Sequence, residues 1–281
     1  MRFVDIKNDV AFRKIFGNKK KTKCLISFLN AVLGLEGSNR VAQVTIIDPF
    51  LLPRIKGEKA SIIDVRATDQ KGRQFIVEMQ VADKDSFDKR VQYYTSKNYS
   101  LQILQGEDYP LLNPTYFVGI LNFPFGKNPF YHTKHLIVDE DTGENLLKDI
   151  KFAFIQLTKF KKKEKELVTM IDKWTYFIKN AKKLEVIPEN TDDEGLNEAY
   201  SEADKHNWSK EALLAYDNAG MREQDARGEK SKAISNAVHD RNIEIARKLL
   251  IKELDVDLVA ETMGLSIEEV QEIADELTDN K

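Results

Sequence analysis

Hydrophobic and polar positions along the chain follow two different periods. Residues 9–34 carry apolar side chains three and four positions apart, which predicts a helix that ends at Gly34. Three segments then alternate between apolar and polar positions, as strands do: 43–50, 61–68 and 73–82. The polar residues 69–72, which end in Gly72, separate the last two of these strands and predict a hairpin turn.

The rest of the chain continues with helices and strands and then becomes helical only. The further elements are a helix over 86–105, strands over 115–123, 135–139 and 151–157, and a long helix over 160–184. We therefore expect an α/β core with a central mixed sheet flanked by helices over 1–188, and an all-helical tail over 189–281. Near the end, Gly264 joins two short amphipathic helices, and Ser266 with Glu269 forms a capping box at the second.

The terminal helix pair has the pattern of a helix-turn-helix unit, but its surface is acidic. Asp and Glu are the charged residues throughout 255–277. A helix that reads DNA needs cations that face the phosphates. We therefore interpret this pair as a packing or dimerisation element, through which the chain could form a homodimer.

Composition excludes several classes of protein. Hydrophobic residues are 42% and charged residues 32% of the 281 residues, which is typical of a soluble globular protein. Apolar stretches such as 116–125 are much shorter than the roughly 20 residues that cross a bilayer, so we expect no membrane span. Because Cys24 is the single cysteine, an internal disulfide is impossible, and a reducing cytoplasm is the expected location.

Charge is divided unevenly along the chain. Residues 185–281 hold 11 Lys and Arg against 25 Asp and Glu, whereas residues 1–184 hold 32 against 21. A basic core suits a polyanion such as DNA, whose phosphates supply most of the non-specific affinity. The acidic tail could repel or mask that partner, or it could simply be a solvated helical surface, and the sequence supports both interpretations.

Two acidic residues face each other across the predicted hairpin. Along the second strand, Glu78 and Gln80 share one face because side chains alternate. If the turn centres on Lys71, Asp64 lies opposite Glu78, since each is seven positions from that centre. Two carboxylates that converge in this way raise each other's pKa unless a cation lies between them.

Mg²⁺ is the cation that suits such a pair, with Mn²⁺ as an alternative. Mg²⁺ binds one or two carboxylates, keeps several waters and can bridge to a phosphate oxygen. The backbone carbonyl of Met79 is a further candidate ligand. A bound ion would lower the pKa of an attacking water and stabilise the leaving oxygen of a phosphodiester. Acids on the solvent face of a sheet have the same spacing, so spacing alone leaves both interpretations open.

The pattern D-x13-E-x-Q, with VEMQ at 77–80, resembles the active-site hairpin of Rpn and transposase-associated PD-(D/E)XK nucleases. The motif NDVAFRKIFG at 8–17 resembles their opening helix, through Asp9, Phe12, Lys14 and Phe16. FIQLTKF and DKWTYF, within 154–177, resemble motifs that come later in the sequences of these nucleases. The resemblance implies a restriction-endonuclease-like core, in which Asp64 and Glu78 hold the metal, and hydrolysis of DNA in a recombination or transposition context.

One position departs from the superfamily pattern. The PD-(D/E)XK pattern has a lysine two residues after the second acid. This chain has Gln80 there, whose amide can orient water but brings no charge. The Rpn-like family also shows glutamine here. A cation could come from elsewhere, with Lys59 and Lys14 as the nearest candidates in the sequence.

Further acids lie near the start of the chain and in a loop. Asp9 can complete the acidic cluster as a catalytic residue, or it can simply interact favourably with its helix N-terminus, for about 0.3–1 kcal/mol. Glu58, in a loop, is a weaker candidate for the cluster.

Candidate DNA contacts lie mainly on the helix after the hairpin. Arg90, Tyr94 and Lys97 recur at helical spacing and would form one cationic, aromatic face. Lys14 is a further candidate. Two lysine clusters, at 19–23 and 159–165, could extend a track for phosphates. Tyrosines on a helical stripe also fill cores, and runs of charge are also solvated faces, so these interpretations stay open.

The sequence therefore predicts a metal-dependent DNA endonuclease with Asp64, Glu78 and Gln80 at its centre. The alternative is a catalytically weak or inactive protein that keeps the nuclease fold to bind DNA or protein. Gln80 and the acidic tail make this alternative plausible.

Overall fold

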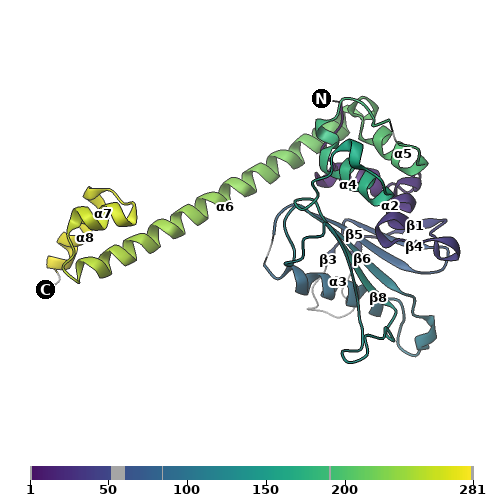
Figure 1. The fold of residues 1–281 in the computed structure, drawn as a ribbon, viewed down its shortest axis with the longest axis horizontal. Coiled ribbons are helices and arrows are strands. Elements are labelled where there is room, and N and C mark those ends of the chain that lie inside the picture. Colours follow the sequence, from purple (N-terminus) through teal and green to yellow (C-terminus); the bar gives the residue numbers. More distant parts are fainter. Residues whose placement is uncertain (1, 52–60, 84, 190, 280–281) are drawn as a thin grey trace. The chain divides into compact units, whose positions relative to one another are not determined.

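The computed structural model describes residues 2–51, 61–83, 85–189 and 191–279. It divides into two compact units, Met1–Ala219 and Gly220–Lys281, and Figure 1 shows the elements of both. Within the described ranges, no helix is both long enough and apolar enough to span a membrane.

A mixed six-stranded sheet is the centre of the first unit, which confirms the predicted α/β class (Figure 1). Its strands, in spatial order, are β1 (Val44–Ile47), β4 (Val65–Asp69), β5 (Gln74–Gln80), β6 (Thr115–Leu121), β8 (Ile150–Gln156) and β7 (His132–Leu136). Strands β5, β6 and β8 are parallel, whereas β1, β4 and β7 run antiparallel to their neighbours. A separate two-stranded sheet pairs β2 (Phe50–Leu51) with β3 (Ser61–Ile62).

The predicted hairpin joins β4 and β5. Its turn is held by Asp69, whose Oδ1 accepts hydrogen bonds from the N–H groups of Lys71 and Arg73, each at 2.9 Å. Gly72 has a φ of 78°, a left-handed conformation that glycine adopts without strain. The register pairs Val65 with Val77. The turn chemistry therefore fixes which residues of the two strands lie opposite each other.

One face of the sheet is covered by α1 (Asp9–Phe16), α2 (Lys23–Leu33), α4 (Met170–Asn180) and α5 (Glu194–Ala203). Alternate strand residues such as Phe75 and Val77 point into this core. Trp174 is fully buried at its centre, packs against aromatic rings of α1 and α2, and donates its indole N–H to Ser27 at 3.0 Å. This face carries most of the hydrophobic burial in the unit.

The opposite face is covered by α3 (Phe87–Ser100). Phe87 and Val91 of this helix pack against Ile76 and Phe117 of the sheet. Ser86 is the N-cap residue, but its side chain makes no capping hydrogen bond. The strand residues that alternate with the large core therefore face α3.

Several predicted elements have different bounds from those expected. The strand predicted over 135–139 is β7, His132–Leu136, and the helix predicted to reach 105 ends at Ser100. The helix over 9–34 is two helices, because Gly17 ends α1 and its backbone N–H bonds to the Arg13 carbonyl. The strand over 61–68 is broken between β3 and β4, just before Val65. The predicted helix over 160–184 begins only at α4, where Thr169 and Asp172 form a capping box.

Short 3-10 helices complete the first unit: η1 (Gly37–Asn39), η2 (Tyr109–Leu111), η3 (Glu164–Glu166), η4 (Ala181–Lys183) and η5 (Lys205–Asn207).

The first compact unit extends beyond residue 188, the expected end of the core. Leu196, Ala199 and Tyr200 of α5 are buried with the other core helices. The start of the chain also binds this region, because the Val4 N–H donates to the Ala203 carbonyl at 2.9 Å. That the nuclease core itself ends at 188 stays a prediction. The compact unit that contains this core includes α5.

The second unit is helical, as the sequence predicts for the end of the tail. It contains the later part of α6 (Lys210–Leu250), α7 (Val256–Met263) and α8 (Ile267–Asp279). Gly264 has a φ of 64° and ends α7. The Ser266 hydroxyl accepts from the Glu269 N–H at 3.2 Å, and the Glu269 carboxylate accepts from the Ser266 N–H at 2.8 Å. The predicted capping box is therefore confirmed.

Candidate active site

Asp64 and Glu78 meet at the end of the β4–β5 hairpin. Asp64 directly precedes β4, and the strand register places it opposite Glu78, as the sequence predicts. Two reciprocal hydrogen bonds join the strands here: the Asp64 N–H donates to Glu78 Oε1 at 3.1 Å, and the Met79 N–H donates to Asp64 Oδ2 at 2.9 Å. The two carboxylates are thus held side by side by backbone donors.

Both carboxyl groups are largely removed from water. Glu78 is 5% exposed, and the Asp64 side chain is 11% exposed. Burial, followed by the charge of Asp64, raises the pKa of Glu78 to about 8. Burial also raises the pKa of Asp64, although the Met79 N–H and Arg13 act in the opposite direction. The pair therefore carries an electrostatic cost that a cation would relieve.

Arg13 is a cation at this site that the sequence did not identify. Its Nη2 and Nε lie 3.0 and 3.3 Å from Asp64 Oδ1, and its side chain is half-exposed. Lys14, the neighbouring residue, lies elsewhere, with its ammonium 5.1 Å from the Trp208 ring. Lys59 lies outside the described residues. The spacing of Arg13, one helical turn after Asp9, is the sequence signal that could have indicated it.

Gln80 connects Glu78 to Arg90. Its side-chain amide donates to Glu78 Oε2 at 2.7 Å, and its carbonyl oxygen accepts a hydrogen bond from Arg90. The Arg90 guanidinium also lies 5.4 Å from the Phe87 ring. Position 80 itself is neutral, but the contact with Arg90 fixes which way the amide points and brings a positive charge close to Glu78.

Tyr94 and Lys97 lie on the same helix as Arg90. Burial, and next the charge of Glu78, raises the pKa of Tyr94, so its phenol lies near the acidic pair. Lys97 is 5% exposed, and its ammonium lies 5.7 Å from the Tyr93 ring. The helical spacing therefore brings Arg90 and Tyr94 to the acids, whereas Lys97 is packed against the protein.

Asp9 lies at the first turn of α1 and is exposed. Its charge contributes to the raised pKa of Asp64, so the structure places it on the side of the acidic pair. The helix is capped by Asn8, whose side-chain oxygen accepts from the Val10 N–H at 3.0 Å. Asp9 is therefore near the site without being part of the reciprocal pair. Glu58 lies outside the described residues.

The donor atoms of the pair fit a hard divalent cation. Among the described residues, no group of three or more His, Cys, Asp or Glu side chains is arranged to hold a metal. Mg²⁺ does not require such a group, because it binds one or two carboxylates and retains waters. The Met79 carbonyl adds an oxygen on the Asp64 side, since the C=O and N–H of a strand residue point the same way and its N–H contacts Asp64.

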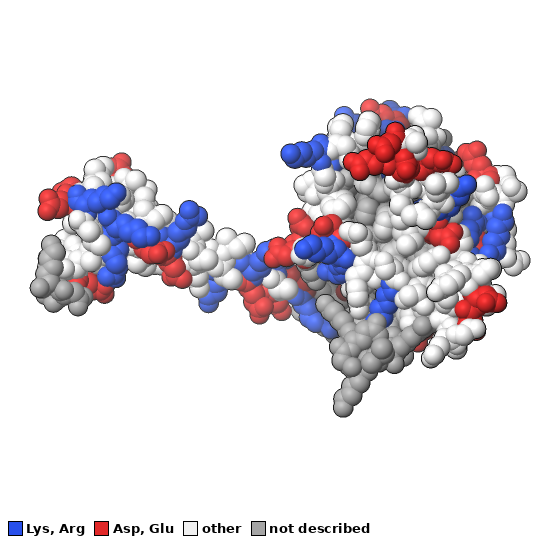
Figure 2. Space-filling model, turned by 90° about the horizontal axis from the view of Figure 1, so that it is seen from below, with Lys and Arg blue, Asp and Glu red and all other residues white. Residues whose placement is uncertain are grey.

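Four lysines of the two clusters bind other groups of the protein. Lys21 pairs with Glu202, and Lys23 with Glu194 at 2.7 Å. In the second cluster, Lys162 pairs with buried Asp172, and Lys159 donates to three backbone carbonyls, those of Phe125, Gly126 and Asn128. On the face shown in Figure 2, basic and acidic side chains lie interspersed. These four lysines therefore stabilise the fold.

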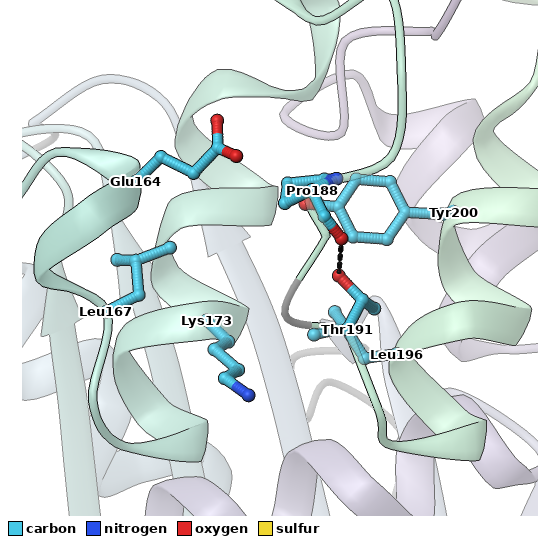
Figure 3. Close-up of a pocket in the computed structure, with 7 residues that line it drawn as sticks. All are labelled: Glu164, Leu167, Lys173, Pro188, Thr191, Leu196 and Tyr200. Carbon is cyan, nitrogen blue, oxygen red and sulfur yellow. Dashed lines mark hydrogen bonds between the residues drawn. The ribbon is translucent and has the colours of Figure 1, made fainter.

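The first unit also has a small hollow, whose lining residues Figure 3 shows in close-up. Its lining residues are Glu164, Leu167, Lys173, Pro188, Thr191, Leu196 and Tyr200. They come from α4, α5 and the segments beside them, which cover the opposite face of the sheet from α3. Thr191 Oγ donates to the Pro188 carbonyl at 2.7 Å and so fixes one wall. This hollow is separate from the site of the carboxylates.

The chain matches the model of a known protein family over most of its length. The model of a family described as "PD-(D/E)XK nuclease family transposase" matches residues 6–233, which is most of the chain. No curated protein and no solved structure matches. The matched range includes both acids, Gln80, Arg13 and Arg90.

Proposed function

Because the chain belongs to the PD-(D/E)XK nuclease family of transposases, we propose that it is an endonuclease that hydrolyses DNA phosphodiester bonds with Mg²⁺, or Mn²⁺, held by Asp64 and Glu78. The observation that carries this proposal is the reciprocal pair of hydrogen bonds that holds the two buried carboxylates together. Perturbed acids of this kind are typical of functional sites. The reducing cytoplasm is the expected compartment, as the lone Cys24 suggests.

Each residue of the site has a proposed role. Asp64, Glu78 and the Met79 carbonyl would supply the protein oxygens for the ion. When bound, the ion supplies Lewis acidity toward the phosphodiester and a lowered pKa for an attacking water. Gln80 holds Glu78 in place and can orient a water with its remaining N–H. Asp9 would add negative charge beside the pair.

The proposed DNA contacts surround the acids. Arg90 would contact a phosphate while it orients Gln80, and Tyr94 would offer its ring and hydroxyl to the same strand. Lys97, which is 5% exposed, must move to reach a phosphate. Lys14 would bind the DNA backbone further along α1. There it lines a polar hollow together with Asn18, Lys21, Ser201, Glu202 and Asn207.

Plasmid nicking tests the proposal. Wild-type protein should convert supercoiled plasmid to nicked and linear forms with Mg²⁺, and EDTA should stop the reaction. Asp64→Asn and Glu78→Gln should each abolish it, because each removes an anionic ligand. Glu144→Gln removes a carboxylate from an exposed loop and should leave the rate unchanged. Intact plasmid with a measurable mobility shift would instead support a non-catalytic DNA-binding protein, which the neutral Gln80 favours.

The second unit is the proposed site of self-association. Ile234 and Val238 lie one helical turn apart on α6 and are 55% and 53% exposed. Two apolar side chains on one helical stripe are suited to pack against a second copy. The double substitution Ile234→Lys and Val238→Lys in the full chain should lower the mass measured by sedimentation. An unchanged mass would exclude a homodimer through this stripe.

A further inference from the structure

Arg13 contacts the oxygen of Asp64 that a metal ion would also need. The Met79 N–H binds Oδ2, and both Arg13 contacts are to Oδ1, which accepts from no backbone N–H of the residues that the structure describes. A divalent ion at Oδ1 would repel the guanidinium and compete for the same lone pairs. Arg13 and the ion are therefore alternative partners of one atom.

We propose that Arg13 is a phosphate-binding residue that metal binding releases from Asp64. This inference rests on the proposed function, because it assigns a substrate contact to the same site. In the metal-free protein, the guanidinium neutralises Asp64. With an ion held by Asp64 and Glu78, the Arg13 guanidinium would be free to bind a phosphate of the DNA.

The side chain of Arg13 has the exposure and donors for this exchange. It is 50% exposed, whereas the Asp64 side chain is 11% exposed, so the arginine forms the outer layer of the pair. The contact uses Nε and Nη2 of a group that carries five N–H donors. Guanidinium binds phosphate with paired hydrogen bonds, which makes arginine suited to this ligand.

The charges at the site also support a cationic residue that binds phosphate. The superfamily pattern places a lysine at the position of Gln80, and this chain has a neutral amide there. Arg90 is engaged with Gln80 on the α3 side, so it stands next to Glu78. Among the described residues, Arg13 is the cation that contacts Asp64. The exchange would thus deliver a positive charge to the phosphate only after the metal has bound.

The salt dependence of DNA binding tests this proposal without any need for cleavage. Affinity for a 30-base-pair duplex would be measured from about 50 to 200 mM salt, once in EDTA and once with Ca²⁺. Each phosphate contact contributes a slope of about 0.9, or roughly a three- to fourfold change in affinity over that range. Arg13→Gln should reduce the slope by about 0.9 with Ca²⁺ and leave it unchanged in EDTA. Arg13→Lys, which keeps the charge, should retain most of the slope with Ca²⁺.

Two further variants control the measurement. Lys148→Gln removes an exposed cation just before β8, at the other end of the parallel strands, and should leave the slope unchanged in both conditions. Asp64→Ala removes the partner of Arg13, so in EDTA it should increase the slope by about one contact, and this increase should vanish in the double variant with Arg13→Gln. Melting curves would establish that each variant is folded.

The outcomes separate this inference from the proposed function. Equal slopes for wild type and Arg13→Gln with Ca²⁺ would assign Arg13 a structural role only and overturn the inference, even if the wild type nicks plasmid. An equal loss of slope in EDTA and Ca²⁺ would overturn the release by metal. A wild-type protein that binds DNA as described but never nicks would overturn the proposed hydrolysis while supporting Arg13.

Discussion

The two faces of β5 belong to one strand and carry opposite kinds of chemistry. One face lies under α1, α2, α4 and α5 and carries Phe75, Val77 and Met79 in a continuous hydrophobic core. The other lies toward α3 and ends in Glu78 and Gln80, which share hydrogen bonds with Asp64 and Arg90. Because side chains alternate along a strand, neighbouring residues serve stability and chemistry separately.

The difference between the faces shows where free energy is gained and where it is given up. Burial of a side chain such as Phe75 or Val77 stabilises the fold by about 1.5–3 kcal/mol. Glu78 is buried almost as completely, but its raised pKa shows that burial disfavours the charged form. Ionising the acid in that place costs stability, and an acid perturbed in this way is typical of a site with a function.

The largest effect is expected when the charge of Glu78 is removed. We expect Glu78→Gln to reduce the nicking rate by about a thousandfold or more, equal to about 4 kcal/mol of barrier, because the ion loses an anionic ligand. The same variant should be more stable than the wild type in EDTA at pH 8, where the buried carboxylate is partly ionised. Nicking assays and urea denaturation measure both effects. A variant that keeps full activity would contradict the division of roles.

The opposite result is expected on the core face. Trp174→Ala should lower the free energy of unfolding by about 3–5 kcal/mol, because it removes a fully buried ring and leaves a cavity. Nicking per folded molecule should not change. Val168→Ala, at a nearby position that is 83% exposed, is the control and should leave the unfolding curve unchanged. Loss of catalysis in folded Trp174→Ala would show that the two faces are coupled.

Stability should depend on pH through the acidic face. Burial raises the pKa of Glu78 from 4.5 to about 8, so the folded protein holds this proton more tightly than the unfolded chain. The stabilisation is present below about pH 4.5 and is lost as the pH rises to about 8. The loss should amount to roughly a few kcal/mol, because each tenfold difference in proton affinity between the folded and unfolded states is equal to about 1.4 kcal/mol. Urea denaturation in EDTA at pH 5 and pH 8 should show this loss in the wild type and much less of it in Glu78→Gln. A variant with the wild-type pH dependence would exclude Glu78 as its source.

A smaller effect is expected from the residue that orients Gln80. Arg90→Gln should lower the nicking rate by about 10- to 100-fold, because it removes the group that orients Gln80, the hydrogen-bond partner of the proposed metal ligand Glu78. Lys89→Gln, an exposed neighbour on the same helix, removes the same charge and should change the rate little. Equal effects of the two substitutions would indicate that only the net charge of α3 matters.

Local patterns in the sequence were sufficient for the hairpin and its acids. Alternation, a turn with Gly72 and equal spacing from Lys71 gave the register that sets Asp64 opposite Glu78. The break at Gly17 was missed although residues 17–23 begin with a glycine and contain no apolar side chain, a pattern that indicates the end of a helix.

The contacts of the site depend on tertiary packing instead. Arg13 reaches Asp64 across 51 positions of sequence, and no periodicity tells which side of a helix meets a distant strand. The helical spacing of Arg90 and Tyr94 was visible, but the hydrogen bond from Arg90 to Gln80 was not. The extension of the core past 188 was also hidden, since it depends on the start of the chain packing beside α5.

A crystal soaked in Mn²⁺ tests the central claim most directly. Anomalous scattering should give a peak within bonding distance of both Asp64 and Glu78, with Arg13 displaced from Asp64 Oδ1. The peak should be lost in a crystal of Glu78→Gln. Crystals soaked in saturating Mn²⁺ would contradict the assignment of this pair as a metal site if they showed no peak between the two carboxylates and Arg13 still contacted Asp64.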